Sequence, residues 1–158
     1  MTARHISIVV EGLPRAKQRA RTQFFDARGN KLAKPRTYTP PETVAAQTAA
    51  QVAYLSQIGA RAPFEGSVAA IVTAFFPVPK SWLKWKQAVA LAGDYPAVDR
   101  AEDADNIAKL YLDALNGFAY IDDRQVCDLI SHKRYTDGTP RVEIELVFKP
   151  LPLRVVAP

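Results

Sequence analysis

The chain has 158 residues, a formal net charge of +5 and a single cysteine, Cys127. This length suits one domain with a modest core, and one cysteine rules out an intramolecular disulfide. No apolar run approaches the ~18 residues of a membrane helix, and no charged-then-apolar leader opens the sequence. We therefore expect a protein that is neither secreted nor membrane-spanning and that works in a reducing, cytoplasmic compartment.

The positive charge is concentrated near the N-terminus. Residues 15–36 contain eight Lys or Arg and one acid, Asp26, so this segment carries +7 and the rest of the chain sums to −2. A basic segment beside an acidic region elsewhere is expected of a protein that holds phosphates with one part and a metal ion with the other. The alternative is that the basic run is only a solvated loop.

Hydrophobic periodicity predicts the elements in chain order. Strands are expected over 5–11, 67–78, 118–121, 125–135 and 141–149, and helices over 41–58, 81–93 and 105–116. The basic segment follows the first strand and turns at 26–30, and Thr39 and Glu42 have the spacing of a capping box for the first helix. The strands after the third helix are expected to form a β-meander behind it.

These elements predict an α+β fold in a single small domain, with a mixed, mainly antiparallel sheet and about three helices. The domain is expected to span residues 1–149, and a Pro-rich tail, 150–158, to extend beyond it. Cys127 lies in an apolar strand pattern and is expected in the core. Trp82 and Trp85 are spaced for a core or an interface, the alternative being stacking on bases.

Acidic residues gather around the third helix. Asp103 and Asp105 stand at its start, and Asp122 and Asp123 follow a short return strand. A helix from 105 to 116 advances about 17 Å, and an extended return from 117 to 123 covers about 20 Å. Because the two legs match, we expect Asp123 to come back to the level of Asp103 and Asp105, where clustered carboxylates suit a hard cation such as Mg²⁺.

Each residue also has a simpler interpretation. Asp105 alone is explained as an N-cap, and Lys109 as the partner of Asp113 in an intrahelical ion pair. By the helical rise Asp113 is about 12 Å along the axis from Asp105, so it is taken as structural. Spacing does not separate Asp122 from Asp123 as the metal ligand, since adjacent side chains near a strand end point opposite ways.

The ordered motif around this helix resembles the RusA-type Holliday-junction resolvases of bacteria and their prophages. The residues that carry the resemblance are Asp103, Asp105, Asn106, Lys109, Asp113, Leu115, Asn116, Gly117, Asp122, Asp123, Gln125 and Val126, together with the segments 12–21 and 38–40. The resemblance spans roughly residues 5 to 148. It departs at Glu102, where many relatives have Pro or a basic residue.

The resemblance implies an endodeoxyribonuclease that acts in DNA recombination and repair. Its metal ligands would be Asp103, Asp105 and Asp123, the last preferred over Asp122, with Lys109 acting beside them. The cofactor would be Mg²⁺, with Mn²⁺ as a substitute. The enzyme would be a two-fold homodimer that nicks a four-way junction symmetrically.

In the basic segment, we expect Arg15, Lys17, Arg19 and Arg21 to bind DNA. Two alternatives remain at this point. One is a metal-dependent nuclease for other branched or single-stranded DNA, and the other is an inactive module that binds branched DNA without cutting it.

Overall fold

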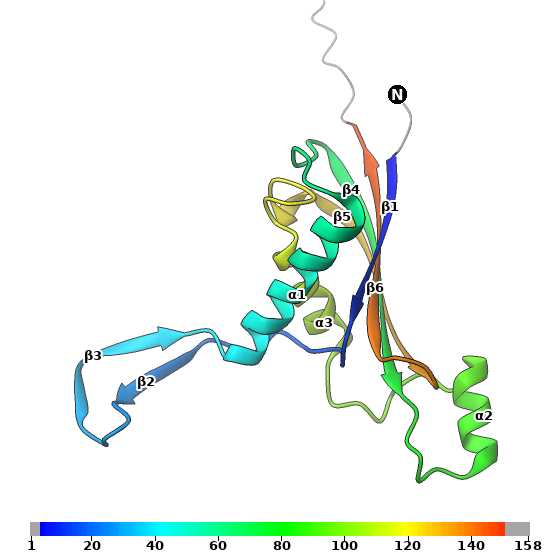
Figure 1. Cartoon of the computed structure of the whole chain (residues 1–158), viewed down its shortest axis with the longest axis horizontal. Coiled ribbons are helices and arrows are strands. Elements are labelled where there is room, and N and C mark those ends of the chain that lie inside the picture. Colours follow the sequence, from blue (N-terminus) through cyan, green and yellow to red (C-terminus); the bar gives the residue numbers. More distant parts are fainter. Residues whose placement is uncertain (1–3, 151–158) are drawn as a thin grey trace, which may run out of the picture.

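A computed structural model describes residues 4–150 and confirms the α+β class. Figure 1 shows a central sheet with two helices against one side and a hairpin that extends away from the body. The elements are β1 (Arg4–Glu11), β2 (Arg21–Phe25), β3 (Lys31–Tyr38), α1 (Pro41–Ile58), β4 (Ser67–Pro77), α2 (Lys84–Ala92), α3 (Ala104–Ala114), a 3-10 turn η1 (Asp123–Gln125), β5 (Val126–Thr136) and β6 (Arg141–Lys149). Within this part of the chain no helix is long and apolar enough to span a membrane.

The central sheet has the strand order β1-β6-β4-β5. The β1–β6 and β6–β4 pairs are antiparallel, whereas β4 and β5 are parallel. The expected meander is therefore wrong, because β6 does not pair with β5 but inserts between β1 and β4. A parallel pair needs a crossover, and the segment from α2 through α3 supplies it.

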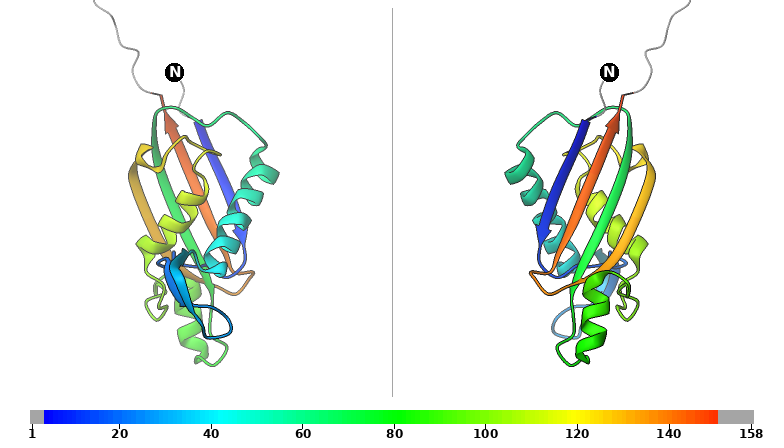
Figure 2. Two further views of the ribbon diagram at one scale, coloured as in Figure 1. Left: turned by 90° about the vertical axis from the view of Figure 1, so that its left-hand side faces the viewer. Right: turned by 90° about the vertical axis from the view of Figure 1, so that its right-hand side faces the viewer.

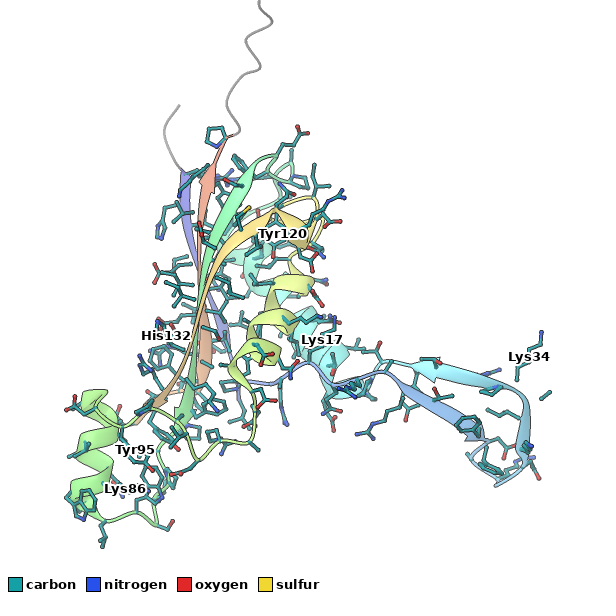
Figure 3. All side chains as sticks on the ribbon, turned by 180° about the vertical axis from the view of Figure 1, so that it is seen from behind. Lys17, Lys34, Lys86, Tyr95, Tyr120 and His132 are labelled. Atoms are coloured by element: carbon teal, nitrogen blue, oxygen red, sulfur yellow. The ribbon has the colours of Figure 1, made fainter. Side chains whose placement is uncertain are left out.

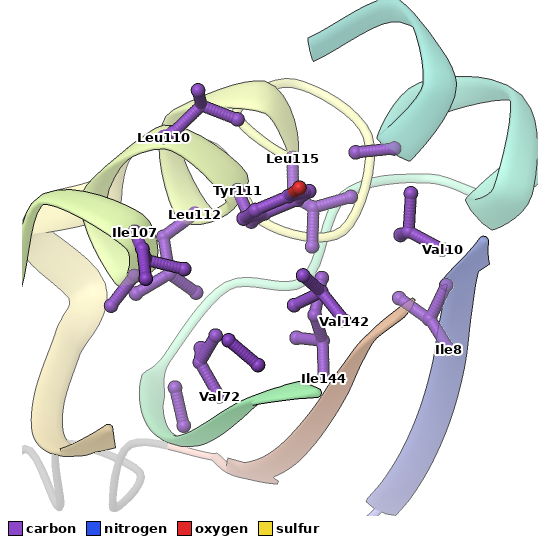
Figure 4. Close-up of a cluster of buried hydrophobic side chains, with 14 of the residues drawn as sticks. Ile8, Val10, Val72, Ile107, Leu110, Tyr111, Leu112, Leu115, Val142 and Ile144 are labelled. Carbon is purple, nitrogen blue, oxygen red and sulfur yellow. The ribbon is translucent and has the colours of Figure 1, made fainter. Parts of the chain in front are cut away.

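One face of the sheet forms the core. Alternating side chains of β1, β4 and β6 are buried on it, as period-two strands require, and α1 and α3 cover them (Figures 1 and 2). Helix α3 presents its expected apolar stripe to this face, and the close-up in Figure 4 shows part of the resulting cluster. The stripe residues predicted from spacing are all buried: Ile107, Leu110, Tyr111, Ala114 and Leu115.

Strand β5 lies at the edge of the sheet, and this position overturns one expectation. Cys127 is exposed rather than in the core, because the start of β5 is uncovered on both faces and residues 127–130 are all exposed. Trp82 packs against the core and contacts the rings of Tyr95 and Tyr135, as expected, but Trp85 on α2 is 65% exposed.

Two further local predictions are also wrong. No capping box starts α1: its N-cap is Pro40, which makes no side-chain cap bond. Residues 118–121 form a compact turn instead of a strand, since the amides of Gly117 and Phe118 donate to the carbonyls of Tyr120 and Leu115 at 2.7 and 3.0 Å. Gly117 has a φ of 75°, the left-handed conformation predicted for the end of this helix.

The basic segment forms an antiparallel hairpin, β2–β3, in a two-stranded sheet of its own. We call residues 21–38 the arm. Its turn falls at 26–30, as predicted. Figure 1 and Figure 3 both show the arm extending from the body near the ends of α1 and α3. The predicted tail falls almost entirely on 151–158, outside the described residues.

Candidate active site

The loop before α3 is held against β5 by three side-chain bonds. Ser131 donates to the carbonyl of Ala104 at 2.8 Å. Lys133 donates to the carbonyls of Arg100 and Glu102, both at 2.9 Å. These bonds fix the start of α3, which carries Asp103 and Asp105, against the middle of β5.

Helix α3 and the segment after it line one acidic pocket of about 320 Å³. Its polar lining comes from Asp105, Lys109 and Asp113 on α3 and from Asp123 at the start of η1. The three helix residues share one face because they are four residues apart. Two of the predicted metal ligands and the predicted lysine are thus brought to one place.

Asp113 and Asp123 lie beside each other. The pKa of Asp123 is raised, first because its carboxyl hydrogen-bonds with Asp113, then by burial and by the negative charges of Asp113 and Asp122. Two neighbouring carboxylates resist simultaneous ionisation in this way. The pocket therefore favours a cation or a proton at this point.

Asp122 has a different role from Asp123. It is the N-cap of η1, where its carboxylate accepts from the amide of Arg124 at 3.0 Å and forms a capping box with Gln125. The Gln125 side chain also donates to the carbonyls of Phe64 and Gly66 at 2.9 and 2.8 Å, which fixes η1 to the start of β4. Asp122 thus shapes the turn that presents Asp123 to the pocket.

The segment leading into the arm is fastened to α3. The backbone amide of Lys17 donates to the carbonyl of Asn106 at 3.0 Å, and its side-chain ammonium pairs with Asp113. Arg15 donates its amide to the hydroxyl of Tyr111 at 3.4 Å. Figure 3 shows Lys17 where the arm leaves the body.

Lys109 lies between the acidic pocket and the basic segment that leads into the arm. It lines the acidic pocket and also a second hollow formed by Lys17, Gln18, Arg19, Ala20 and Asn106. The alternative ion pair between Lys109 and Asp113 is not formed within the described residues, where Asp113 pairs with Lys17 instead. The lysine therefore lies next to both the acidic pocket and residues 15–21, where the arm joins the body; we call this segment the arm root.

Asp103 is placed differently from the other predicted ligands. It is the N-cap of α3, is exposed and accepts a hydrogen bond from Asn106 at 3.4 Å. It does not line the acidic pocket. The N-cap interpretation, which we considered for Asp105, applies to Asp103, although its side chain makes no capping bond.

Asp113 is the pocket residue that sequence reasoning missed. The helical rise puts it about 12 Å along the axis from Asp105, so the sequence predicts a structural role for it and a long extended return that brings Asp123 to the level of Asp103 and Asp105. The compact turn at 118–121 shortens that return and puts Asp123 beside the last turns of α3. The available signal was the spacing of four residues from Lys109, which places Asp113 on the same helical face.

The donor set fits a hard divalent cation. The pocket offers carboxylate oxygens, the ligands that Mg²⁺ prefers, and the hydrogen bond with Asp113, burial and the neighbouring carboxylates raise the pKa of Asp123. Among residues 4–150 no three His, Cys, Asp or Glu side chains are already grouped closely enough to hold one ion in common. Ion binding would therefore draw the carboxylates together.

Comparison with known families adds an independent finding. The family model for endodeoxyribonuclease RusA matches residues 11–147, most of the chain. The chain belongs to the RusA endodeoxyribonuclease family. No curated protein matches it in sequence.

Membership gives the pocket its chemical context. RusA-family proteins are hydrolases that cut DNA at Holliday junctions, and they generally depend on a divalent metal ion. Branched DNA is thus the substrate class of the family. The resemblance deduced from the motif is confirmed, while the roles of single residues remain predictions.

Proposed function

We propose that this protein is a Mg²⁺-dependent endonuclease, with Mn²⁺ as a substitute, that resolves four-way DNA junctions by paired symmetrical nicks. The observation that carries the proposal is the position of Lys109 between the acidic pocket and the root of a basic arm. A scissile phosphate held there would meet cations on one side and the metal ligands on the other.

Asp105 and Asp123, together with Asp103 from the start of the same helix, are the residues proposed to hold the ion. A bound divalent cation would lower the pKa of a bound water and stabilise charge on the phosphate. Lys109 would offset the negative charge that develops on the phosphate. Asp113, paired with Lys17, would support Asp123 and tie the basic segment to the pocket.

The basic residues at the arm root would bind the DNA backbone. Arg15, Arg19 and Arg21 are exposed and suit phosphate contacts. Lys17 is half-buried in its pair with Asp113, so we propose that it positions the segment more than it contacts phosphate. Two symmetrical cuts require two active sites, and a two-fold homodimer provides them.

The first test compares cleavage of a labelled four-way junction and a matched linear duplex, each with Mg²⁺ and with chelator. We expect paired nicks at the junction only when Mg²⁺ is present. Cutting of both substrates would support a less selective nuclease. Tight metal-independent binding without nicks would support an inactive binding module.

The second test replaces one proposed ligand. Asp105→Asn should reduce junction cleavage at least 100-fold, in the range seen when a key electrostatic group is removed, and leave junction binding intact. Asp94→Asn, an exposed acid after α2, is the matched control and should cut normally. Equal cleavage by Asp105→Asn and wild type would refute the site. Sedimentation of the protein as a monomer at micromolar concentration would refute the homodimer.

A further inference from the structure

The arm exposes two aromatic side chains near its tip. Phe24 and Phe25 are 52% and 56% exposed although they lie within strand β2. The hairpin register shifts between Gln23 and Phe25, so Phe24 has no partner residue on β3 and the two rings lie where the strand pairing is irregular. No residue of β2 or β3 is buried, so these rings do not pack into a core of the arm. Large apolar side chains left exposed in this way indicate a binding surface for a partner.

The tip that carries these rings is held by hydrogen bonds. The Asp26 carboxylate accepts from the amides of Arg28 and Asn30, both at 2.8 Å, and from the Asn30 side chain at 3.2 Å. These bonds lower the pKa of Asp26, and Gly29 supplies the positive φ of 83° that the turn needs. The only acid in the arm is thus engaged in shaping the turn.

Charge complementarity identifies the partner as nucleic acid. Within the described residues, none of the arm's basic side chains forms an ion pair. These residues are Arg21, Arg28, Lys31, Lys34 and Arg36, and all are exposed. Figure 3 shows Lys34 at the far end of the arm from Lys17. A basic surface with interleaved aromatic rings is the arrangement that binds unstacked bases.

The reach of the arm matches such a role. Strand β3 has eight residues and spans about 26 Å at ~3.3 Å per residue, roughly twice the ~12 Å width of the DNA major groove. When the arm root holds a phosphate, the tip of the arm therefore reaches bases on the far side of the groove. A continuous duplex presents no free base face there, whereas the base pairs that flank the centre of an open, unstacked junction each lack one stacking neighbour.

We infer that Phe24 and Phe25 stack on the bases exposed at the branch point of branched DNA, so that the arm distinguishes a junction from a plain duplex. This inference rests on the proposed function, because it takes the substrate of the same site to be branched DNA. The rings supply the preference for the branch, and the surrounding cations supply affinity for any DNA backbone.

The test measures binding of a four-way junction that carries 2-aminopurine beside the branch point, and of a linear duplex with the same probe, both in chelator. Wild type should bind the junction more tightly and change the 2-aminopurine fluorescence only in the junction. The double variant Phe24→Ala, Phe25→Ala should lose about 10- to 100-fold in junction affinity, the usual effect of removing stacked aromatics, and should lose the fluorescence change. Its duplex affinity should stay within about twofold.

Three matched variants make the result specific. Phe24→Tyr with Phe25→Tyr retains both rings and should restore the junction preference. Lys31→Gln with Lys34→Gln should weaken junction and duplex alike and reduce the salt slope by about 2. Trp85→Ala removes an exposed aromatic ring from α2, far from the arm, and should behave as wild type.

The outcomes separate the inference from the proposed function. If wild type neither prefers nor cuts junctions, the proposed function fails. If wild type does both and the double alanine variant matches it, only the arm inference fails. An equal loss in Trp85→Ala, or a double alanine variant whose main defect is a shift from dimer to monomer, would also overturn the inference.

Discussion

At the scale of single residues, the neighbouring carboxylates of the acidic pocket repel one another, and a lysine partly offsets their charge. Asp113 raises the pKa of Asp123, and Lys17 offsets part of the charge on Asp113. When an acid has a higher pKa in the folded protein than in the unfolded chain, its protonated form stabilises the fold. This contribution to the free energy of unfolding is complete below the unfolded-state pKa and is lost as pH rises through the folded-state pKa. In the metal-free protein, the charged Asp123 carboxylate therefore destabilises the folded state at neutral pH.

Removing the charge of Asp123 should therefore stabilise the metal-free protein. We expect Asp123→Asn to raise the melting temperature of the metal-free protein at pH 7, and to do so much less at pH 3, where the wild-type carboxyl is protonated. Added Mg²⁺ should raise the melting temperature of wild type but not of the variant. Thermal unfolding followed by circular dichroism measures both effects, with Asp94→Asn as the control. A lower melting temperature for metal-free Asp123→Asn at pH 7 would contradict the interpretation.

At the scale of elements, the site depends on how two segments are fastened to α3. The return after the helix is a compact turn that carries Asp123 to the pocket, and the segment at 15–17 crosses the helix on the way to the arm. The Lys17–Asp113 pair joins the second segment to the first, with side chains that are 34% and 15% exposed. Such a partly buried pair is expected to be worth more than an exposed one.

A double-mutant cycle should detect this coupling. Lys17→Met and Asp113→Asn, alone and together, should show an interaction of about 1 kcal/mol in urea unfolding, within the usual range for contacting charged residues. The matched cycle uses Lys86 and Asp99, a more exposed pair at 3.4 Å, and should give less than about 0.5 kcal/mol. Additive effects for the Lys17 cycle would show that the pair does not couple the arm root to α3.

At the scale of the whole molecule, the sheet has one face covered by helices and another that carries a mixture of polar and apolar groups. Neighbouring residues of β6 show the contrast: Leu146 is fully buried and Val147 is half-buried on the opposite face. Helix α2 lies at one end of the sheet, on the side away from α1 and α3 (Figures 1 and 2). Stability is thus expected to come mainly from the helix-covered face.

Two truncations in adjacent positions test this asymmetry. Leu146→Ala should lower the free energy of unfolding by about 2–5 kcal/mol, the usual cost of emptying a packed site. Val147→Ala should cost less than about 1 kcal/mol, since part of its side chain already contacts solvent. Urea unfolding of the two variants measures the difference. Equal losses would mean that the second face is also buried, as it would be against a second copy of the chain.

The sequence by itself determined the type of each element except the β2–β3 hairpin and the turn at 118–121, together with the apolar face of α3, the turn at the arm tip and the family. These depend on local signals: periodicity, Gly and Pro positions, and a motif of closely spaced Asp, Asn and Lys residues. From the sequence the hairpin is identified only as a basic segment, because its two strands show no regular alternation of apolar and polar residues.

Only the tertiary structure decided which residues meet. Strand order depends on long-range pairing, so the insertion of β6 between β1 and β4 had no local signal. Asp113 joined the pocket because the turn at 118–121 folded compactly on itself, and Lys17 became its partner because the chain crosses α3 ninety-six positions away in sequence. Both outcomes follow from packing between distant segments, which periodicity along one segment does not encode.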